Sequence, residues 1–212
     1  MFHANSNHES RSEDPRGIDP KTAASQLREI LAASGKGQGI LSQQGALVEW
    51  ACREKRILGG HYELSAFRPG GLEHLILHDV QGGLVYKLTY GGAFGRMVRK
   101  ISSGLAPASP LEYFDRWAIH NDLFSKLTQV VGIFDSAGCP QILVVQKALQ
   151  GEIPTTADTD TFMRLAGFEP VLDIEFAWKN EDVGIYIFDA RPANFLSILG
   201  NPVPFDLIPV RL

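Results

Sequence analysis

Several features that would assign a protein to a particular class are missing from this sequence. Its 212 residues contain two cysteines, Cys52 and Cys139, which belong to no Cys-x-x-Cys pair or Cys/His cluster. We therefore expect two reduced thiols rather than a disulfide framework or a zinc site. No apolar run approaches the roughly 18 residues of a membrane span, and the polar N-terminus lacks the apolar core of a secretory signal. These absences predict a cytoplasmic protein that does not bind membranes.

A strong charge of either sign is also missing. Lys and Arg number 20 against 24 Asp and Glu, which gives a formal net charge of −4. This balance provides no overall basic field to hold a phosphate backbone, so a nucleic-acid partner is not expected. Hydrophobic residues make up 44% of the chain, enough to bury one sizeable core with room for two lobes.

The hydrophobic periodicity predicts a disordered tail followed by a mixture of helices and short strands. The tail covers residues 1–19, and two helices at 20–33 and 42–58 form a helical extension over 20–60. Two further helices are predicted at about 110–127 and 156–166, the first opened by a capping box of Ser109 and Glu112. Strands are predicted at 61–67, 72–79, 84–90, 130–135, 141–146, 171–178, 183–188, 195–199 and 203–210. The order predicts an α+β fold, with an antiparallel sheet carrying one inserted helix and then a small strand-rich half.

Polar residues after the apolar strand at 183–188 form the first candidate site. Residues 189–194 read Asp-Ala-Arg-Pro-Ala-Asn, a tight loop that directs Asp189 and Asn194 to one place. Asp189 is a candidate base for an attacking hydroxyl, and the Asn194 amide oxygen is a candidate Mg²⁺ ligand beside nucleotide phosphates. A strand-end turn held by Asx hydrogen bonds is the structural alternative.

The next segment adds a carboxylate to this site. The apolar runs 195–199 and 203–208 flank Gly200-Asn201-Pro202, which predicts a hairpin. Such a hairpin folds Asp206 back almost opposite Asn194, so that both oxygens reach one metal ion. Asp206 lies between Phe205 and Leu207, where a carboxylate without a partner would be unfavourable.

Lys87 supplies the opposite charge. It lies within an apolar strand and therefore needs a carboxylate or a phosphate as its partner. Glu112, on the following helix, is the candidate carboxylate, with Asp115 and Asp122 as substitutes, although the capping box alone also explains Glu112. ATP phosphates would lie between Lys87 and the ion on Asn194 and Asp206. His74 and His78, four residues apart, are interpreted as ordinary histidines because a metal needs more ligands.

These motifs together resemble the serine/threonine/tyrosine kinase domain found in bacterial polyvalent proteins of phages and conjugative elements. The strand lysine, the D-x-x-P-x-N loop and the metal-binding Asp occur in the order of the protein-kinase signature. The resemblance covers roughly residues 60–212. Besides 189–206, the segments that carry it are 71–74 (GLEH), 86–95 (YKLTYGGAFG), 110–116 (PLEYFDR), 120–124 (HNDLF), 162–163 (FM) and 167–168 (GF).

The resemblance implies a reduced protein-kinase-like fold that uses ATP and Mg²⁺ to phosphorylate a hydroxyl acceptor, with a protein as one candidate acceptor. Residues 61–146 would form the N-lobe, and 147–212 the hinge and a truncated C-lobe. It implies Lys87 on the phosphates, Asp189 as catalytic base, and Asn194 and Asp206 on the metal. The adenine-side hinge would be formed by Gln146, Lys147, Ala148 and Leu149.

The sequence also departs from the protein-kinase pattern. Ile187-Phe188 stand where His-Arg is usual, Leu207-Ile208 replace Phe-Gly, and no G-x-G-x-x-G precedes Lys87. The turn at Gly70 and Gly71 is the nearest approach to a loop that covers the phosphates. These departures leave two other interpretations open: a catalytically inactive pseudokinase that binds nucleotide or protein, and an accessory protein of a mobile element without a nucleotide site.

Overall fold

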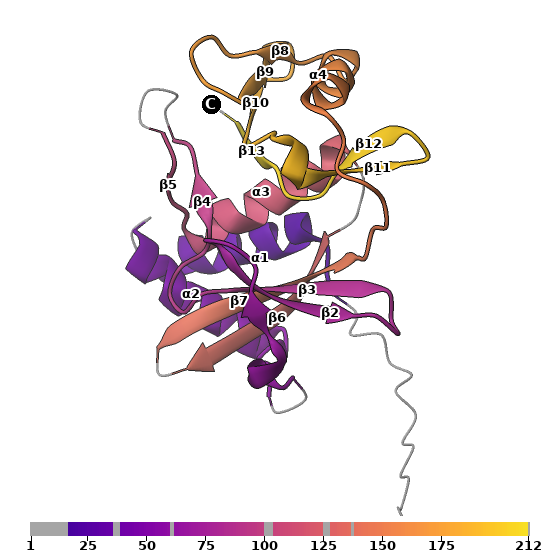
Figure 1. Ribbon diagram of the computed structural model, residues 1–212. Coiled ribbons are helices and arrows are strands. Elements are labelled where there is room, and N and C mark those ends of the chain that lie inside the picture. Colours follow the sequence, from indigo (N-terminus) through magenta and orange to yellow (C-terminus); the bar gives the residue numbers. More distant parts are fainter. Residues whose placement is uncertain are drawn as a thin grey trace, which may run out of the picture.

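The computed structural model describes residues 17–35, 39–59, 62–99, 104–124, 128–136 and 138–211. In this part of the chain the fold is a mixed α+β arrangement of four α-helices and antiparallel sheets, as the sequence predicts (Figure 1). Most of the predicted tail, residues 1–16, lies outside the described residues. None of the described helices has the length and apolar character needed to span a bilayer.

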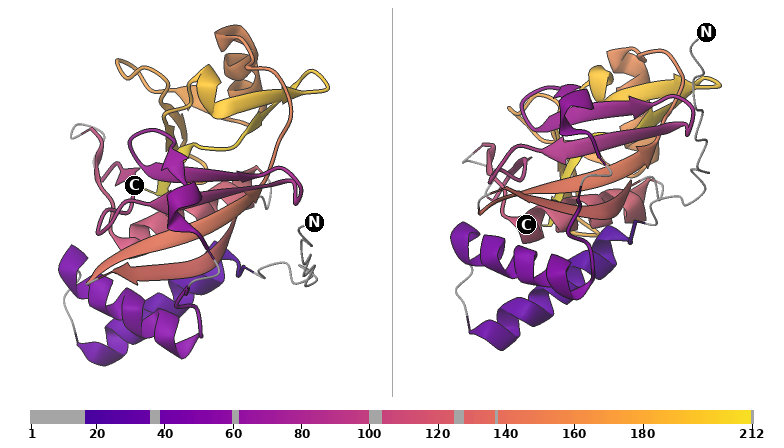
Figure 2. Two further views of the ribbon diagram at one scale, coloured as in Figure 1. Left: turned by 60° about the horizontal axis from the view of Figure 1, so that its bottom comes forward. Right: turned by 90° about the horizontal axis from the view of Figure 1, so that it is seen from below.

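The first half of the chain is built on a five-stranded antiparallel sheet in the order β1-β2-β3-β7-β6. Its strands are β1 (Arg68–Pro69), β2 (His74–Asp79), β3 (Leu84–Thr89), β6 (Thr128–Ser136) and β7 (Cys139–Lys147). Helices α1 (Pro20–Ser34), α2 (Ile40–Arg53) and α3 (Pro110–Leu123) pack on one face of it (Figure 2). A small ribbon of β4 (Arg96–Met97) and β5 (Ala106–Pro107) precedes α3.

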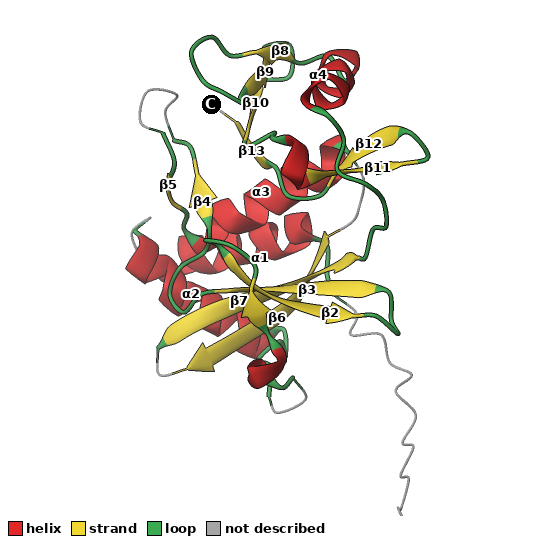
Figure 3. Ribbon diagram, in the orientation of Figure 1, coloured by secondary structure: helices red, strands yellow, loops and turns green. Residues whose placement is uncertain are grey.

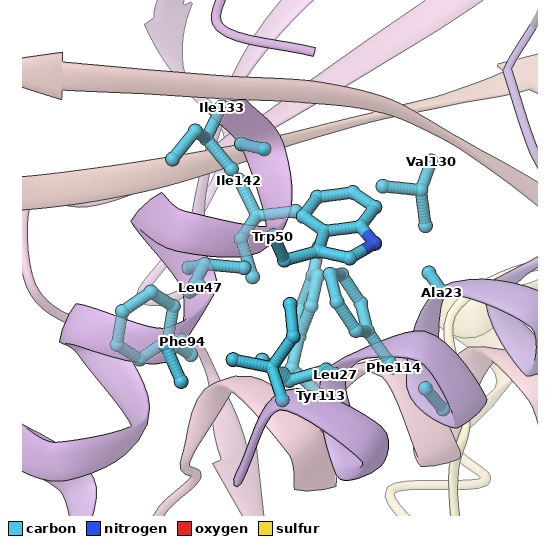
Figure 4. Packing of buried hydrophobic residues seen from close by; sticks show 14 of the residues in the cluster. Ala23, Leu27, Leu47, Trp50, Phe94, Tyr113, Phe114, Val130, Ile133 and Ile142 are labelled. Atoms are coloured by element: carbon cyan, nitrogen blue, oxygen red, sulfur yellow. The ribbon is translucent and has the colours of Figure 1, made fainter. Parts of the chain in front are cut away.

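One hydrophobic core unites the N-terminal helices with the sheet. Trp50 of α2 is fully buried and meets Phe114 of α3 edge to face, with ring centroids 5.5 Å apart (Figure 4). Leu27 of α1 and Ile142 of β7 belong to the same cluster. Each large side chain buried in this way stabilises the fold by about 1.5–3 kcal/mol. The predicted helical extension is therefore packed into the core of the sheet.

The second half contains a four-stranded antiparallel sheet in the order β13-β10-β9-β8 and a two-stranded hairpin. The sheet strands are β8 (Glu169–Pro170), β9 (Trp178–Asn180), β10 (Ile185–Phe188) and β13 (Ile208–Arg211), and the hairpin strands are β11 (Phe195–Ile198) and β12 (Asn201–Pro204). Helix α4 (Thr156–Leu165) packs here through the buried Met163. Helix α3 lies between the two halves (Figure 3), and its Ile119 and Leu123 pack against this second core.

Three predicted strands differ from the structure. The segment predicted as a strand at 61–67 instead contains η1 (Leu64–Ala66), and its first residue lies outside the described residues. Residues 171–177 form turns in which Asp173 and Phe176 have positive φ, a conformation that a strand does not allow. The strand predicted at 203–210 is divided into β12 and β13 by residues 205–207. Side chains from the first half of the chain bind this interruption.

Candidate functional site

Lys87 lies in the middle of β3 and is 4% exposed. Its neighbours Tyr86 and Leu88 point into the apolar cluster on the other face of the sheet, because successive side chains of a strand alternate. The Lys87 Nζ lies 3.4 Å from Oδ1 of Asp206 and donates a hydrogen bond to the Phe205 carbonyl at 3.3 Å. It also stands 5.0 Å from the centroid of the Trp117 ring. The sequence requires an anionic partner for this lysine, and in the structure that partner is Asp206 instead of Glu112.

Asp206 has a second cationic neighbour, Arg116 of α3. This arginine is 3% exposed, and its Nη2 donates to Asp206 Oδ1 at 3.0 Å. Its Nη1 donates to Glu73 Oε2 at 2.6 Å, and its Nε donates to the Leu207 carbonyl at 3.0 Å. Two buried cations and two partly buried carboxylates therefore alternate in a chain from Lys87 through Asp206 and Arg116 to Glu73.

The pKa shifts follow from this charge arrangement. Burial opposes ionisation of Asp206, but Lys87 and Arg116 outweigh it and hold the pKa of Asp206 well below its ordinary value. Burial lowers the pKa of Lys87, and the Asp206 carboxylate partly offsets this effect. Burial also acts against the charge of Arg116, yet Glu73 and Asp206 raise its pKa above the ordinary value. The ion pairs thus favour the charged forms of Asp206 and Arg116, whereas burial works against the charge of Lys87.

Asp189 and Asn194 form a second, smaller unit. Asp189 follows β10 with φ +58°, the left-handed region that non-glycine residues rarely occupy. Asn194 ends η3 (Pro192–Asn194), is 6% exposed, and donates through Nδ2 to the Asp189 carbonyl at 2.7 Å and to Asp189 Oδ2 at 2.9 Å. Arg191 Nε lies 3.2 Å from Asp189 Oδ1. The loop thus brings Asp189 and Asn194 together, and Asn194 makes both of these contacts through Nδ2.

The predicted hairpin is present and links the two units, but its strands are residues 195–198 and 201–204 instead of 195–199 and 203–208. Phe195 pairs with Pro204 and Ile198 with Asn201. The Phe205 N–H then donates to the Asn194 carbonyl at 3.0 Å, so Asp206 is adjacent to the residue that faces Asn194. Since Phe205 also accepts from Lys87, a single residue connects the loop at 189–194 to β3.

Glu112 does not pair with Lys87, and this prediction is wrong. Its carboxylate completes the capping box with the Ser109 backbone N–H at 2.7 Å and accepts two hydrogen bonds from Arg99, at 2.9 and 2.8 Å. Burial would raise the pKa of Glu112, but Arg99 and Ser109 lower it below the ordinary value. The physical reason is that the first turn of α3 binds this carboxylate locally. The substitutes Asp115 and Asp122 are also bound elsewhere, to Arg28 and Lys21.

The residues expected to contact the nucleotide lie in the turn between β1 and β2 and at the end of β7. Gly70 and Gly71 form the turn between β1 and β2, and a Cβ atom at Gly70 would lie 2.0 Å from Cγ1 of Ile76. The predicted hinge begins at the end of β7, where Gln146 is buried and donates to the Phe205 carbonyl at 3.1 Å and to Thr128 Oγ1 at 2.7 Å.

Two of the hinge residues already bond to β3 or to the turn before it. Lys147 pairs with Leu84 of β3, and the Ala148 N–H donates to the Gly83 carbonyl at 2.8 Å. Leu149 follows them and is half-buried. The Ala148 N–H therefore has a protein acceptor where the hinge prediction requires a donor for adenine.

A group of metal-ligating side chains overlaps the charge chain. Glu73, His74 and Asp206 each place a ligand atom within 4.8 Å of the others. His74 is 2% exposed and bonds to the Tyr113 hydroxyl at 2.9 Å, and burial lowers its pKa to about 3, which keeps the ring neutral. However, the Arg116 guanidinium already bridges Glu73 and Asp206. A metal ion there would have to displace it, so this group is better explained by the ion pairs.

Sequence reasoning did not identify Arg116 or Glu73 as members of the site. One signal was available, because Arg116 follows Tyr113 by three residues and precedes His120 by four, which places all three on one helical face. The described structure leaves both ring nitrogens of the fully buried His120 without a hydrogen-bond partner. Tyr113, Arg116 and His120 therefore form a buried polar stripe on α3.

Comparison with known proteins adds a family to this geometry. A family model described as "Serine/Threonine/Tyrosine Kinase found in polyvalent proteins" matches residues 85–207, which is more than half of the chain. No curated protein and no solved structure matches. The matched region begins in β3 before Lys87 and ends just after Asp206, so it contains the candidate site except Glu73, His74 and the turn at Gly70 and Gly71.

Proposed function

Because the chain belongs to the family of serine/threonine/tyrosine kinases found in polyvalent proteins, we propose that it is an ATP- and Mg²⁺-dependent phosphotransferase with a hydroxyl acceptor. In this proposal the fold is a reduced kinase fold. Residues 61–146 form its N-lobe, and residues 147–212 form the hinge and a shortened C-lobe. The strand order around Lys87, with α3 inserted before β6 and β7, supports this division.

The observation that carries the proposal is the meeting of Lys87 with Asp206 at 3.4 Å, next to the loop that joins Asp189 to Asn194. Mg·ATP would supply the transferable γ-phosphoryl group and a metal ion that offsets its charge. Both cationic contacts of Asp206 are made by Oδ1, so Oδ2 is the oxygen assigned to the ion, together with Asn194 Oδ1. These oxygens suit Mg²⁺, which prefers hard oxygen ligands.

Each chain residue has a defined task in this proposal. Lys87 holds a phosphate oxygen with a buried ammonium group, which is more effective than a solvated one because little water screens it. Asp189 orients the acceptor hydroxyl and accepts its proton, and Asn194 fixes the Asp189 carboxylate through Nδ2. The turn at Gly70 and Gly71 is the candidate for covering the phosphates, while a catalytic role for Glu112 has no support in its contacts.

The test is incubation of the purified chain with γ-labelled ATP and Mg²⁺, using the chain itself and a mixed protein substrate as acceptors. Label transfer that depends on Mg²⁺ and on Asp189 supports the enzyme. Absence of label transfer together with absence of Mg·ATP-induced thermal stabilisation at millimolar ligand would contradict any nucleotide function, since a ligand that binds only the native state must raise its melting temperature.

A pseudokinase is the second candidate, and one observation favours it. Lys87 and Arg116 already neutralise Asp206, and α3 presents an arginine instead of an acidic residue at this point. In this case the chain would bind nucleotide or a protein partner without turnover. Thermal stabilisation by ATP without label transfer would support this candidate over the enzyme.

A further inference from the structure

Arg116 lies at the centre of the charge chain and makes contact with two segments besides its own helix. It extends from α3, which packs between the two halves of the molecule. Its guanidinium group donates to Glu73, just before β2, and to two consecutive residues of the C-terminal half, Asp206 and Leu207. An arginine that is 3% exposed with all these acceptors has a fixed position, because its planar fork of donors matches them simultaneously.

The contacts of Arg116 with Asp206 and Leu207 define the direction of the Asp206 carboxylate. One nitrogen holds Oδ1, and another holds the carbonyl of the following residue, so both the side chain and the backbone of this segment are fixed. The segment has no strand ladder of its own, since it separates β12 from β13. Lys87 contacts the same Oδ1 from β3. The two cations together therefore leave Oδ2 as the oxygen that can face a ligand.

We propose that Arg116 is a positioning residue of the phosphotransfer site, which aims Oδ2 of Asp206 at the metal ion and links this carboxylate to Glu73 at the start of β2. The inference rests on the proposed function. It differs from the arrangement expected from the sequence, in which a carboxylate of α3 pairs with Lys87. Here α3 contributes a cation to Asp206, and Asp206 supplies the anion for Lys87.

Glu73 connects Arg116 to the turn that is proposed to cover the nucleotide phosphates. It follows Gly70 and Gly71 by two to three residues, and its carboxylate lies 2.6 Å from Arg116. The turn proposed to cover the phosphates is therefore connected to the metal-binding carboxylate through one guanidinium group. Because Arg116 of α3 contacts both carboxylates, a change in its position would alter the contacts of Asp206 and of this turn at the same time.

The test compares Arg116→Lys with the wild-type protein and with Arg28→Lys as matched control. Lysine keeps the charge but cannot hold two carboxylates and a carbonyl simultaneously. Arg28 also pairs with an Asp of α3, Asp115, but on an exposed face of the molecule. Binding of a non-hydrolysable ATP analogue is measured calorimetrically with and without Mg²⁺, and hydrogen exchange is followed over residues 203–208.

We expect Arg116→Lys to weaken binding in the presence of Mg²⁺ by at least tenfold while metal-free binding changes by less than threefold. Exchange should become faster over 203–208 but not in α1 or α2, and Arg28→Lys should match the wild type in every measurement. Unchanged Mg²⁺-dependent binding in a folded Arg116→Lys protein would overturn this inference and leave the proposed function intact. A wild-type protein that does not bind the analogue would instead overturn the proposed function.

Discussion

Lys87 and Asp206 come from opposite ends of the matched family region, yet Nζ of the lysine lies 3.4 Å from Oδ1 of the aspartate. Neither residue would be stable alone in this environment, because an unpaired buried charge is strongly unfavourable. Their pairing joins the sheet of the first half to the segment between β12 and β13 of the second. The same two residues carry the proposed phosphate and metal contacts, so stability and function depend on one interaction.

Replacement of Lys87 tests its role in stability and its role in phosphoryl transfer separately. In Lys87→Met, Asp206 retains Arg116 as a partner, so we expect a loss of about 1–2 kcal/mol in stability and a folded protein. Phosphoryl transfer should fall by roughly 100-fold or more, because a buried cation at the phosphates is lost. Thermal unfolding and the γ-label assay measure the two effects. Lys21→Met removes an exposed lysine paired with Asp122 and should alter neither; equal transfer by Lys87→Met would exclude Lys87 from the chemistry.

Asp189→Asn tests the proposed base while preserving the loop. The Asn side chain can still accept the hydrogen bond from Asn194 Nδ2, so the geometry at 189–194 should be retained. Loss of the proton acceptor should lower kcat by about 10²–10⁴-fold with little change in nucleotide affinity. Steady-state kinetics and calorimetry check this expectation, with Asp182→Asn as an exposed control. A variant with normal kcat would remove Asp189 from the mechanism.

Replacing the buried His120 should stabilise the protein more at acidic pH than at alkaline pH. Burial lowers its pKa to about 3, whereas in the unfolded chain the ordinary value is about 6.5. Between these values the unfolded state binds the extra proton, so this histidine makes the protein less stable as the pH falls from 6.5 towards 3. His120→Met removes that penalty and should add about 2 kcal/mol at pH 5 relative to its effect at pH 8. Urea unfolding at the two pH values measures the difference, and an identical effect at both would contradict it.

The turn at Gly70 and Gly71 yields a prediction about packing. Alanine at Gly70 would bring its Cβ to 2.0 Å from Ile76, so Gly70→Ala should destabilise the protein by about 1–3 kcal/mol. Gly45→Ala is the matched control, since no neighbouring atom lies within 4 Å of a Cβ there and its helical position favours alanine by about 0.5–1 kcal/mol. Melting temperatures of the two variants should therefore change in opposite directions. Equal destabilisation by both would show that the approach to Ile76 is unimportant.

The parts of the site that the sequence revealed are those set by local patterns. Lys87 in an apolar strand required an anionic partner, which Asp206 supplies, and Gly200-Asn201-Pro202 required a hairpin, which β11 and β12 form. The partner of Lys87 was misassigned to Glu112 because capping and ion pairing compete for one carboxylate, and the nearby Arg99 decides that competition.

Long-range contacts account for the remaining differences. The interruption between β12 and β13 exists because Lys87, Gln146 and Arg116 bond to the carbonyls of Phe205 and Leu207 in place of a strand ladder. The apolar pattern of residues 203–210 does not predict these hydrogen bonds, because their donors lie elsewhere in the chain. The pairing of Glu73 with Arg116 likewise could not be predicted from the sequence, because it depends on how α3 lies across the sheet.

The central claim is that Asp206 and Asn194 hold the metal of a bound nucleotide beside Lys87. Its most direct test is an NMR titration of isotope-labelled protein with ADP and Mn²⁺, whose unpaired electrons broaden nearby signals. We predict selective broadening of the Asn194 side-chain amide and of the backbone amides at 205–207, with residues 169–172 unaffected. Broadening confined to other parts of the protein, or absent with ADP in excess, would contradict the account.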